Sequence, residues 1–201
     1  LHTAAIAAGV DIRYSTPARQ LITTNNDTSG QVVIGVEASG EQGALRIRAK
    51  VGVLIASGGF ERNEEMKRHF LRGPSMFTLG IATNTGDGIH MGMAIGADLR
   101  NMNEVWGLTV FKGEGEQNSA SGGAISLAAQ IDRRNAGCIA VNRYGQRFCN
   151  EAADYDSTWR SYHTWENWGD LGYRNLPAFQ LYDQKYRDKN SLAGRQPTEA
   201  L

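Results

Sequence analysis

The chain has 201 residues, of which 41% are hydrophobic, and its 21 basic and 21 acidic side chains give a formal net charge of +0. This length allows one large domain or two small ones, and the balanced charge gives no argument for a nucleic-acid partner. No apolar run approaches the roughly 20 residues of a membrane span. Two cysteines, Cys138 and Cys149, do not form a disulfide framework, so we expect free, buried thiols and a reducing, cytoplasmic compartment.

The first fifty residues alternate between short extended runs and polar turns. Residues 1–8 are alanine-rich and predict a helix that Gly9 ends. Extended structure is predicted for residues 10–14, 20–24, 31–38 and 44–49. Together these runs predict a small antiparallel meander. Because an opening element and a closing element both look cut short, we expect a fragment of a longer protein.

A continuous apolar run follows at residues 51–56 and ends in Ser57-Gly58-Gly59. Such a run is typical of a buried strand of the parallel type. A polar helix capped by Asn63 is predicted next, with its end at Gly73-Pro74. The loop Asn84-Thr85-Gly86-Asp87-Gly88 then opens a second helix, which is predicted to end near Gly96. Met91 and Met93 could line a pocket, but we expect them in the buried core.

The second half begins with a change of composition after Met102. Residues 112–123 are rich in glycine and serine and predict a crossover or a mobile loop. Residues 137–151 predict a hairpin that turns at residues 143–146. Tyr155, Trp159 and Tyr162 are spaced to share one face of a helix. A further strand is predicted at residues 178–182, followed by a short helix that Asp183 caps.

The two glycine loops carry the main chemical signal. Glycine lets backbone approach a large ligand closely, and amides at a helix N-terminus favour an anion. The Asp87 carboxylate could accept hydrogen bonds from ribose or ribityl hydroxyls, or it could be a helix N-cap. Alone, the two interpretations of Asp87 are evenly balanced. The two loops together predict a nucleotide-type cofactor. His69, His90 and His163 lack metal-ligand spacing, so we expect them to be structural and expect no metal site.

Four segments, in their order, resemble the flavoprotein family of fumarate reductases and 3-ketosteroid dehydrogenases. They are Ile55–Asn63, Asn84–Ile89, Gly137–Arg143 and Gly145–Glu151. The resemblance implies an α/β fold with α+β insertions. Residues 1–103 would be part of a Rossmann-type FAD-binding domain that lacks its N-terminal Gly-x-Gly-x-x-Gly fingerprint, and residues 104–201 part of a mobile capping domain. It also implies FAD contacts from Ala18, Ser57, Gly58, Gly59, Asn84, Thr85, Gly86 and Asp87.

Two branches of this family differ shortly after the Asn-Glu pair, here Asn150-Glu151. Fumarate reductases carry a proton-donating arginine there, whereas Tyr155 stands at that place and resembles the ketosteroid branch. Arg160 could replace the arginine only with a shift of register. Residues 176–187 also resemble the ketosteroid branch. The resemblance therefore implies a small apolar substrate that bears a carbonyl, such as a steroid, and leaves the electron acceptor open.

The implied reaction moves a hydride to flavin N5 while a proton leaves the neighbouring carbon. A phenol has an ordinary pKa of about 10, so Tyr155 would have to be activated or relay its proton. The alternative for Tyr155 is a surface or packing aromatic. Two alternatives for the whole protein are a fumarate reductase-like enzyme for a short unsaturated acid and a non-catalytic remnant that holds no flavin.

Overall fold

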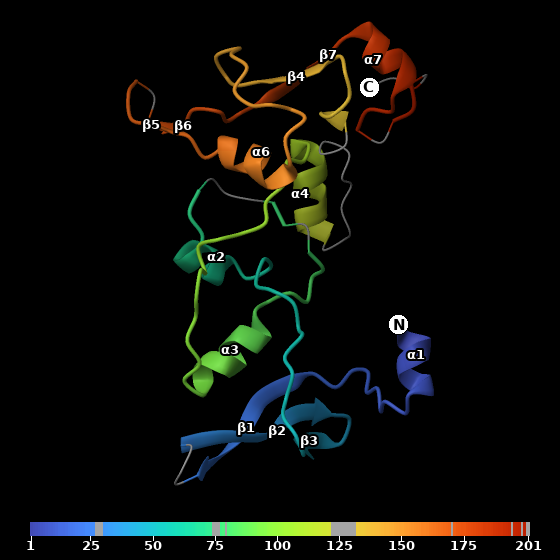
Figure 1. The fold of residues 1–201 in the computed structure, drawn as a ribbon, viewed down its shortest axis with the longest axis vertical. Helices are drawn as coiled ribbons and strands as arrows, with labels where there is room; N and C mark the ends of the chain where they lie inside the picture. The colour runs from blue at the N-terminus through green and yellow to red at the C-terminus, as the bar shows by residue number, and fades with distance from the viewer. Residues whose placement is uncertain are drawn as a thin grey trace. The chain divides into compact units, whose positions relative to one another are not determined.

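The computed structural model describes residues 1–26, 30–73, 77–78, 80–121, 132–169, 171–193, 195–197 and 199 (Figure 1). The chain divides into two compact units. Unit 1 consists of Leu1–Phe60 and Asn84–Arg100, and unit 2 consists of Glu61–Thr83 and Asn101–Leu201. Among the described residues, no helix combines the length and the hydrophobicity that a bilayer crossing requires.

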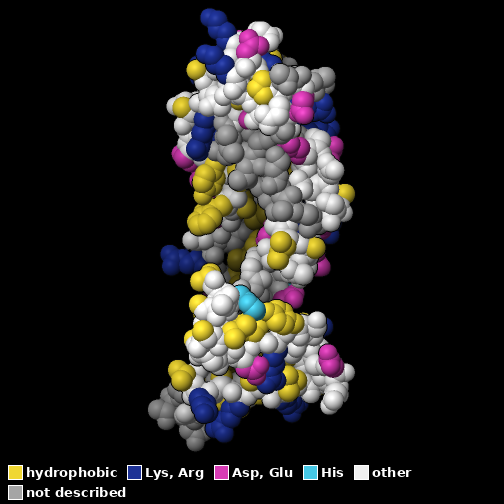
Figure 2. All heavy atoms as spheres, turned by 90° about the vertical axis from the view of Figure 1, so that its right-hand side faces the viewer, with side chains coloured by type: hydrophobic (Ala, Val, Ile, Leu, Met, Phe, Trp, Pro, Cys, Tyr) yellow, Lys and Arg dark blue, Asp and Glu magenta, His cyan; other side chains and the backbone are white. Residues whose placement is uncertain are grey.

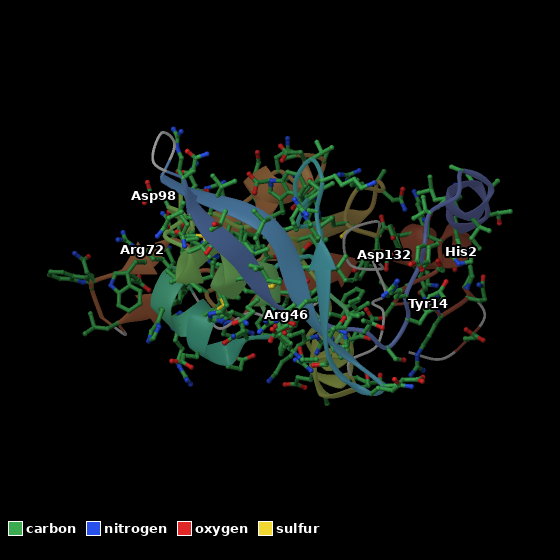
Figure 3. The ribbon with its side chains drawn as sticks, turned by 90° about the horizontal axis from the view of Figure 1, so that it is seen from below. His2, Tyr14, Arg46, Arg72, Asp98 and Asp132 are labelled. Atoms are coloured by element: carbon green, nitrogen blue, oxygen red, sulfur yellow. The ribbon has the colours of Figure 1, made fainter. Side chains whose placement is uncertain are left out.

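Unit 1 is built on an antiparallel meander with the strand order β1-β2-β3. The strands are β1 (Ala18–Asn26), β2 (Gly30–Gly40) and β3 (Gly43–Arg48). The register pairs Leu21 with Val36 and Val36 with Ile47, which confirms the predicted meander. The first turn falls on residues 27–29, which lie outside the described residues. Arg46, labelled in Figure 3, pairs with Glu37 across the second turn at 2.8 Å.

Two helices complete unit 1. Helix α1 (His2–Ala7) ends before Gly9, whose φ of +77° confirms the predicted helix stop. Helix α3 (Asp87–Ala94) lies over the meander and contacts β1 (Figure 1). It starts after Gly86 and ends near Gly96, as predicted from the sequence.

Two predicted strands of unit 1 do not form. Among the described residues, none pairs with residues 10–14 in a ladder, and Ser15, with a φ of +49°, turns the chain directly after them. The Tyr14 hydroxyl contacts the His2 ring instead (Figure 3).

The apolar run at residues 51–56 was also predicted as a buried strand, and this was wrong. No strand among the described residues pairs with it, and Val51 and Leu54 are almost fully exposed, at 104% and 91%. A strand is defined by the neighbour that accepts its backbone hydrogen bonds, so an apolar sequence alone does not form one. Figure 2 shows hydrophobic side chains at the surface elsewhere as well.

Unit 2 contains a small sheet in which β4 (Cys138–Val141) pairs antiparallel with β7 (Phe179–Tyr182). Helix α7 (Gln184–Lys189) follows, and the Asp183 side chain accepts a hydrogen bond from the Tyr186 amide at 2.6 Å, as predicted. Cys138, Tyr186 and Leu192 form a buried cluster against which Phe111 and Tyr182 pack. This cluster is the apolar core of the described part of unit 2.

Helix α2 (Glu64–Phe70) is capped by Asn63, whose side chain accepts from the Met66 amide at 3.0 Å. The cap was predicted correctly, but the helix ends at Phe70, before Gly73.

Helix α4 (Lys112–Ser121) stands where a crossover or mobile loop was predicted. Its contacts explain the difference. The Arg62 guanidinium donates to the Ser119 carbonyl at 2.9 Å, and the Ser119 hydroxyl accepts from the Thr78 amide at 2.9 Å. Gly115 is buried, and a Cβ there would lie 2.4 Å from the Phe77 ring. Glycine-rich composition, which weakens a helix on its own, here allows the close packing that stabilises it.

The hairpin predicted at residues 137–151 forms only its turn. The Gly145 amide donates to the Asn142 carbonyl at 2.9 Å, and Val141 bridges Arg147. The partner strand of β4 is β7, and the Ala140 amide is bound by the Glu151 side chain at 2.8 Å, which replaces a second strand. Helix α6 (Tyr155–Ser161) and the short pair β5 (Trp165–Glu166) and β6 (Gly172–Tyr173) follow.

Candidate functional site

The two glycine loops of unit 1 are tied together through their backbones. The Gly86 amide donates to the Gly59 carbonyl at 3.0 Å. Gly58 has a φ of +79°, in the left-handed region, and a Cβ there would lie 2.5 Å from Asn84 Oδ1. Both the conformation and the spacing therefore require glycine at this position.

The second loop leads directly into helix α3. Gly86 is the N-cap with a φ of +88°, and no side chain caps the first turn. The interpretation of Asp87 as an N-cap is therefore wrong, because Asp87 is the first helical residue. Its carboxylate is exposed, and Oδ1 accepts from the Thr85 hydroxyl at 2.8 Å. Amides of an uncapped first turn favour a negatively charged group.

An open hollow of about 310 Å³ lies between residues 55–58 on one side and helix α3 with the residues that follow it on the other. Of the residues predicted to bind the cofactor, Ser57 and Gly58 line it. Gly88 also lines it, and a Cβ there would lie 2.5 Å from Ser57 Oγ. The rest of the lining is largely apolar and includes Ile55, Ile89, Met93 and Leu99.

Of the apolar half of this hollow, the sequence indicated only Met93 as a pocket residue, and only as the less favoured alternative to a core position. Met93 was expected in the core with Met91, but only Met91 is buried, whereas Met93 is 45% exposed and lines the hollow. The spacing of Ile89, Gly92 and Met93 along one face of α3 was the available signal. It is equally typical of a core face, so it could not identify a ligand site.

The other predicted cofactor residues lie outside this lining. Gly59, Asn84, Thr85, Gly86 and Asp87 form the tie between the loops and the start of α3. Ala18 is the first residue of β1, where it pairs with Ala38. The hollow therefore brings together only part of the predicted set.

The residues present fit a nucleotide-type cofactor. Gly58 is exposed and its φ lies in the left-handed region, so its backbone is open to close approach, and the first turn of α3, which no side chain caps, favours an anion. Apolar side chains on the opposite wall suit a flat ring system.

Tyr155, the predicted catalytic residue, lies in unit 2 as the first residue of α6. The helix is capped by Asp154, whose side chain accepts from the Ser157 amide at 2.9 Å. Tyr155 is 39% exposed, so its phenol is open to solvent. Arg160, the possible replacement for the arginine of fumarate reductases, is instead paired with Asp156 and Glu104, both at 2.9 Å, and these bonds raise the pKa of its guanidinium.

Cys138 and Cys149 are free thiols, and Cys138 is buried as predicted while Cys149 is half-buried. Burial raises the pKa of Cys138 to about 11. In the part of the chain that the structure describes, no three His, Cys, Asp or Glu side chains are arranged to hold a metal ion. Burial, together with the nearby Arg160, lowers the pKa of His163.

The chain is similar to known dehydrogenases along almost its whole length. The chain is 32% identical to a 3-oxosteroid 1-dehydrogenase of Mycobacterium tuberculosis over 96% of its own length and 33% of that protein. It is 31% identical to a 4-oxocyclohexanecarboxylate 2-dehydrogenase of Sinomonas cyclohexanicum over 99% of its own length and 34% of that protein. The chain thus spans about a third of the length of these relatives.

A crystal structure of 3-ketosteroid delta1-dehydrogenase from Sterolibacterium denitrificans, in complex with 1,4-androstadiene-3,17-dione, matches with a TM-score of 0.78 and 31% identity. The match covers 98% of this chain and 33% of that one, and it confirms the predicted fold class. The sequence model of a family described as an FAD binding domain matches residues 1–176, which confirms the predicted cofactor, FAD. The chain therefore belongs to the FAD binding domain family of flavoproteins.

Proposed function

We propose that the protein is an FAD-dependent dehydrogenase that converts a carbon–carbon single bond beside a ring carbonyl into a double bond. The observation that carries the proposal is the similarity of almost the whole chain to dehydrogenases named for such substrates. One acts on a 3-oxosteroid and another on 4-oxocyclohexanecarboxylate, and both compounds are cyclic ketones. We take a steroid-like ketone as the substrate because the steroid relatives match in both sequence and structure.

In this proposal the two parts of the chain have different roles. Residues 1–103 belong to the FAD-binding part and residues 104–201 to a part that caps the substrate. The Ser57-Gly58-Gly59 and Asn84–Asp87 loops hold the cofactor through backbone amides, and Ala18 meets its adenine through the backbone. FAD, when bound, supplies the acceptor for the hydride.

Tyr155 would take the proton from the carbon beside the carbonyl, so that the substrate loses one hydride and one proton in total. Its exposed phenol at the first turn of α6 is accessible to a substrate, as a proton acceptor must be. This exposure argues against a packing role, and the variant below separates a catalytic phenol from a surface one.

The test is the Tyr155→Phe variant of the full-length protein, assayed with a 3-ketosteroid, 4-oxocyclohexanecarboxylate and fumarate. A positioned acid or base contributes roughly 10²- to 10⁴-fold, so turnover should fall by that factor while flavin absorbance survives desalting. Tyr144→Phe is the matched control, because Tyr144 is also exposed and its hydroxyl donates to Glu166 at 2.6 Å.

Other outcomes would select the alternatives. Unchanged turnover in Tyr155→Phe would remove Tyr155 from the mechanism. Activity on fumarate with none on either ketone would identify a fumarate reductase-like enzyme. A wild-type protein that retains no flavin and turns over none of the three compounds would be a non-catalytic remnant.

A further inference from the structure

We infer that Arg133 is a positioning residue whose buried guanidinium fixes the backbone that presents Tyr155. The inference rests on the function proposed above, because it matters for turnover only if Tyr155 carries the proton.

Arg133 has an unusual environment for an arginine. It is only 2% exposed, and its two terminal nitrogens donate to two backbone carbonyls, Nη1 to Glu151 and Nη2 to Ala153, the second at 2.9 Å. Burial lowers the pKa of this guanidinium, which reflects the cost of placing a charge there. Such a cost is tolerated where the donors are bound in a fixed geometry. The planar fork of an arginine places donors on two separate nitrogens in a fixed geometry, whereas a lysine has a single nitrogen on a flexible stem.

The segment at residues 151–153 is also held through the side chain of Glu151. Its carboxylate is buried, and Oε1 accepts from the Ala140 amide in β4 at 2.8 Å and from Arg147 Nε at 3.0 Å. The side chain of Glu151 is thus anchored to the sheet, while its carbonyl is bound by Arg133. The start of the segment is fixed both to β4 and to the buried guanidinium.

The fixation continues into the first turn of α6. Asp154 caps the helix, and its carbonyl accepts from the Thr158 amide at 3.1 Å and from the Thr158 hydroxyl at 2.8 Å. Thr158 is 2% exposed. Tyr155 follows Asp154 directly. Ala153, the second residue whose carbonyl Arg133 binds, is two residues before Tyr155. A shift of the Ala153 carbonyl would therefore also move the backbone of Tyr155.

Arg160, the arginine on α6 itself, is bound differently, because its ion pairs with Glu104 and Asp156 are half-exposed. A displacement of about 1 Å at a reacting group can cost on the order of 10²-fold in rate. Loss of the fork should therefore lower kcat more than it lowers substrate affinity.

The experiment is a double-mutant cycle in the full-length holoenzyme with the variants Arg133→Lys, Tyr155→Phe and both together. Arg133→Lys keeps the charge but removes the rigid fork that holds the two carbonyls in one fixed geometry. We expect kcat to fall about 10- to 100-fold, with KM and flavin content changed less than about twofold. In the Tyr155→Phe background the same substitution should lower kcat by less than about twofold, because its effect acts through the phenol. Arg160→Met is the control and should leave kcat within about twofold of wild type.

Multiplicative losses in the cycle would overturn the inference, since Arg133 would then act independently of Tyr155. An unchanged kcat in Arg133→Lys would overturn it too. If Arg133→Lys does not fold, Glu151→Gln, which loosens the same segment, replaces it in the cycle under the same criteria. Wild-type turnover in Tyr155→Phe alone would instead show that the proposed function of Tyr155 has failed.

Discussion

Replacing Gly58 by alanine tests whether the tie between the two loops shapes the flavin site. A residue other than glycine in the left-handed region costs about 1–2 kcal/mol. The new Cβ would also lie 2.5 Å from Asn84 Oδ1, so the Asn84 side chain must retreat by roughly 1 Å to reach ordinary contact. Overpacking of this kind typically costs about 1–3 kcal/mol.

Gly9→Ala separates these two effects. Gly9 has a φ of +77°, nearly that of Gly58, but a Cβ there meets no atom within 4 Å. Gly9→Ala should lower the free energy of unfolding only by the cost of placing an alanine in the left-handed region, about 1–2 kcal/mol. Gly58→Ala should lose about 1–3 kcal/mol more, which is the overpacking cost.

The assay has two readouts on the full-length protein: the free energy of unfolding in urea and the Kd for FAD titrated into the apoprotein. We expect Gly58→Ala to weaken FAD binding at least about tenfold, or 1.4 kcal/mol, and Gly9→Ala to leave the Kd unchanged. If Gly58→Ala binds FAD as tightly as Gly9→Ala does, the loop at residues 57–59 does not hold the cofactor as proposed.

Three further predictions follow from unit 2. Burial favours the protonated form of Glu151, but its bonds with Arg147 and Ala140 outweigh this and hold its pKa below the usual value. The ionised Glu151 therefore stabilises the fold above its ordinary pKa of about 4.3, and this stabilisation is lost as the pH falls through the lower pKa of the folded state. The Tm difference between wild type and Glu151→Gln should shrink as the pH falls from 6 to about 3. A Tm difference that stays constant over this range would contradict the prediction. Because burial raises the pKa of both Cys138 and Cys149, iodoacetamide at about pH 8 should label neither thiol in the native protein and both in urea, as read by mass spectrometry. Gly107→Ala would place a Cβ 2.1 Å from the Trp159 indole nitrogen and should cost about 1–3 kcal/mol of stability, whereas Gly113→Ala, in open space on α4, should cost none.

The features predicted correctly from the sequence are those that depend on residues close together in the chain. The alternation in residues 31–38 and 44–49 gave the meander, and Asn63 and Asp183 were correctly identified as helix caps. Both kinds of signal depend on contacts within a few residues. The two glycine loops were found for the same reason, because each marks a turn at a fixed place in the chain.

Features that depend on distant partners were not predicted. The run at residues 51–56 looks like a strand, yet no strand among the described residues pairs with it. Helix α4 forms because Phe77, Thr78 and Arg62 contact it, and its composition does not reveal these contacts. The partner strand of β4 lies about forty residues downstream in β7, which a local turn signal could not indicate.

In the proposed function, the Ser57-Gly58-Gly59 and Asn84–Asp87 loops together hold FAD. A crystal structure of the full-length holoenzyme would show whether they do. We predict backbone amides of both loops within hydrogen-bonding distance of the cofactor, with Gly88 facing it. A cofactor bound with neither loop in contact would contradict the claim.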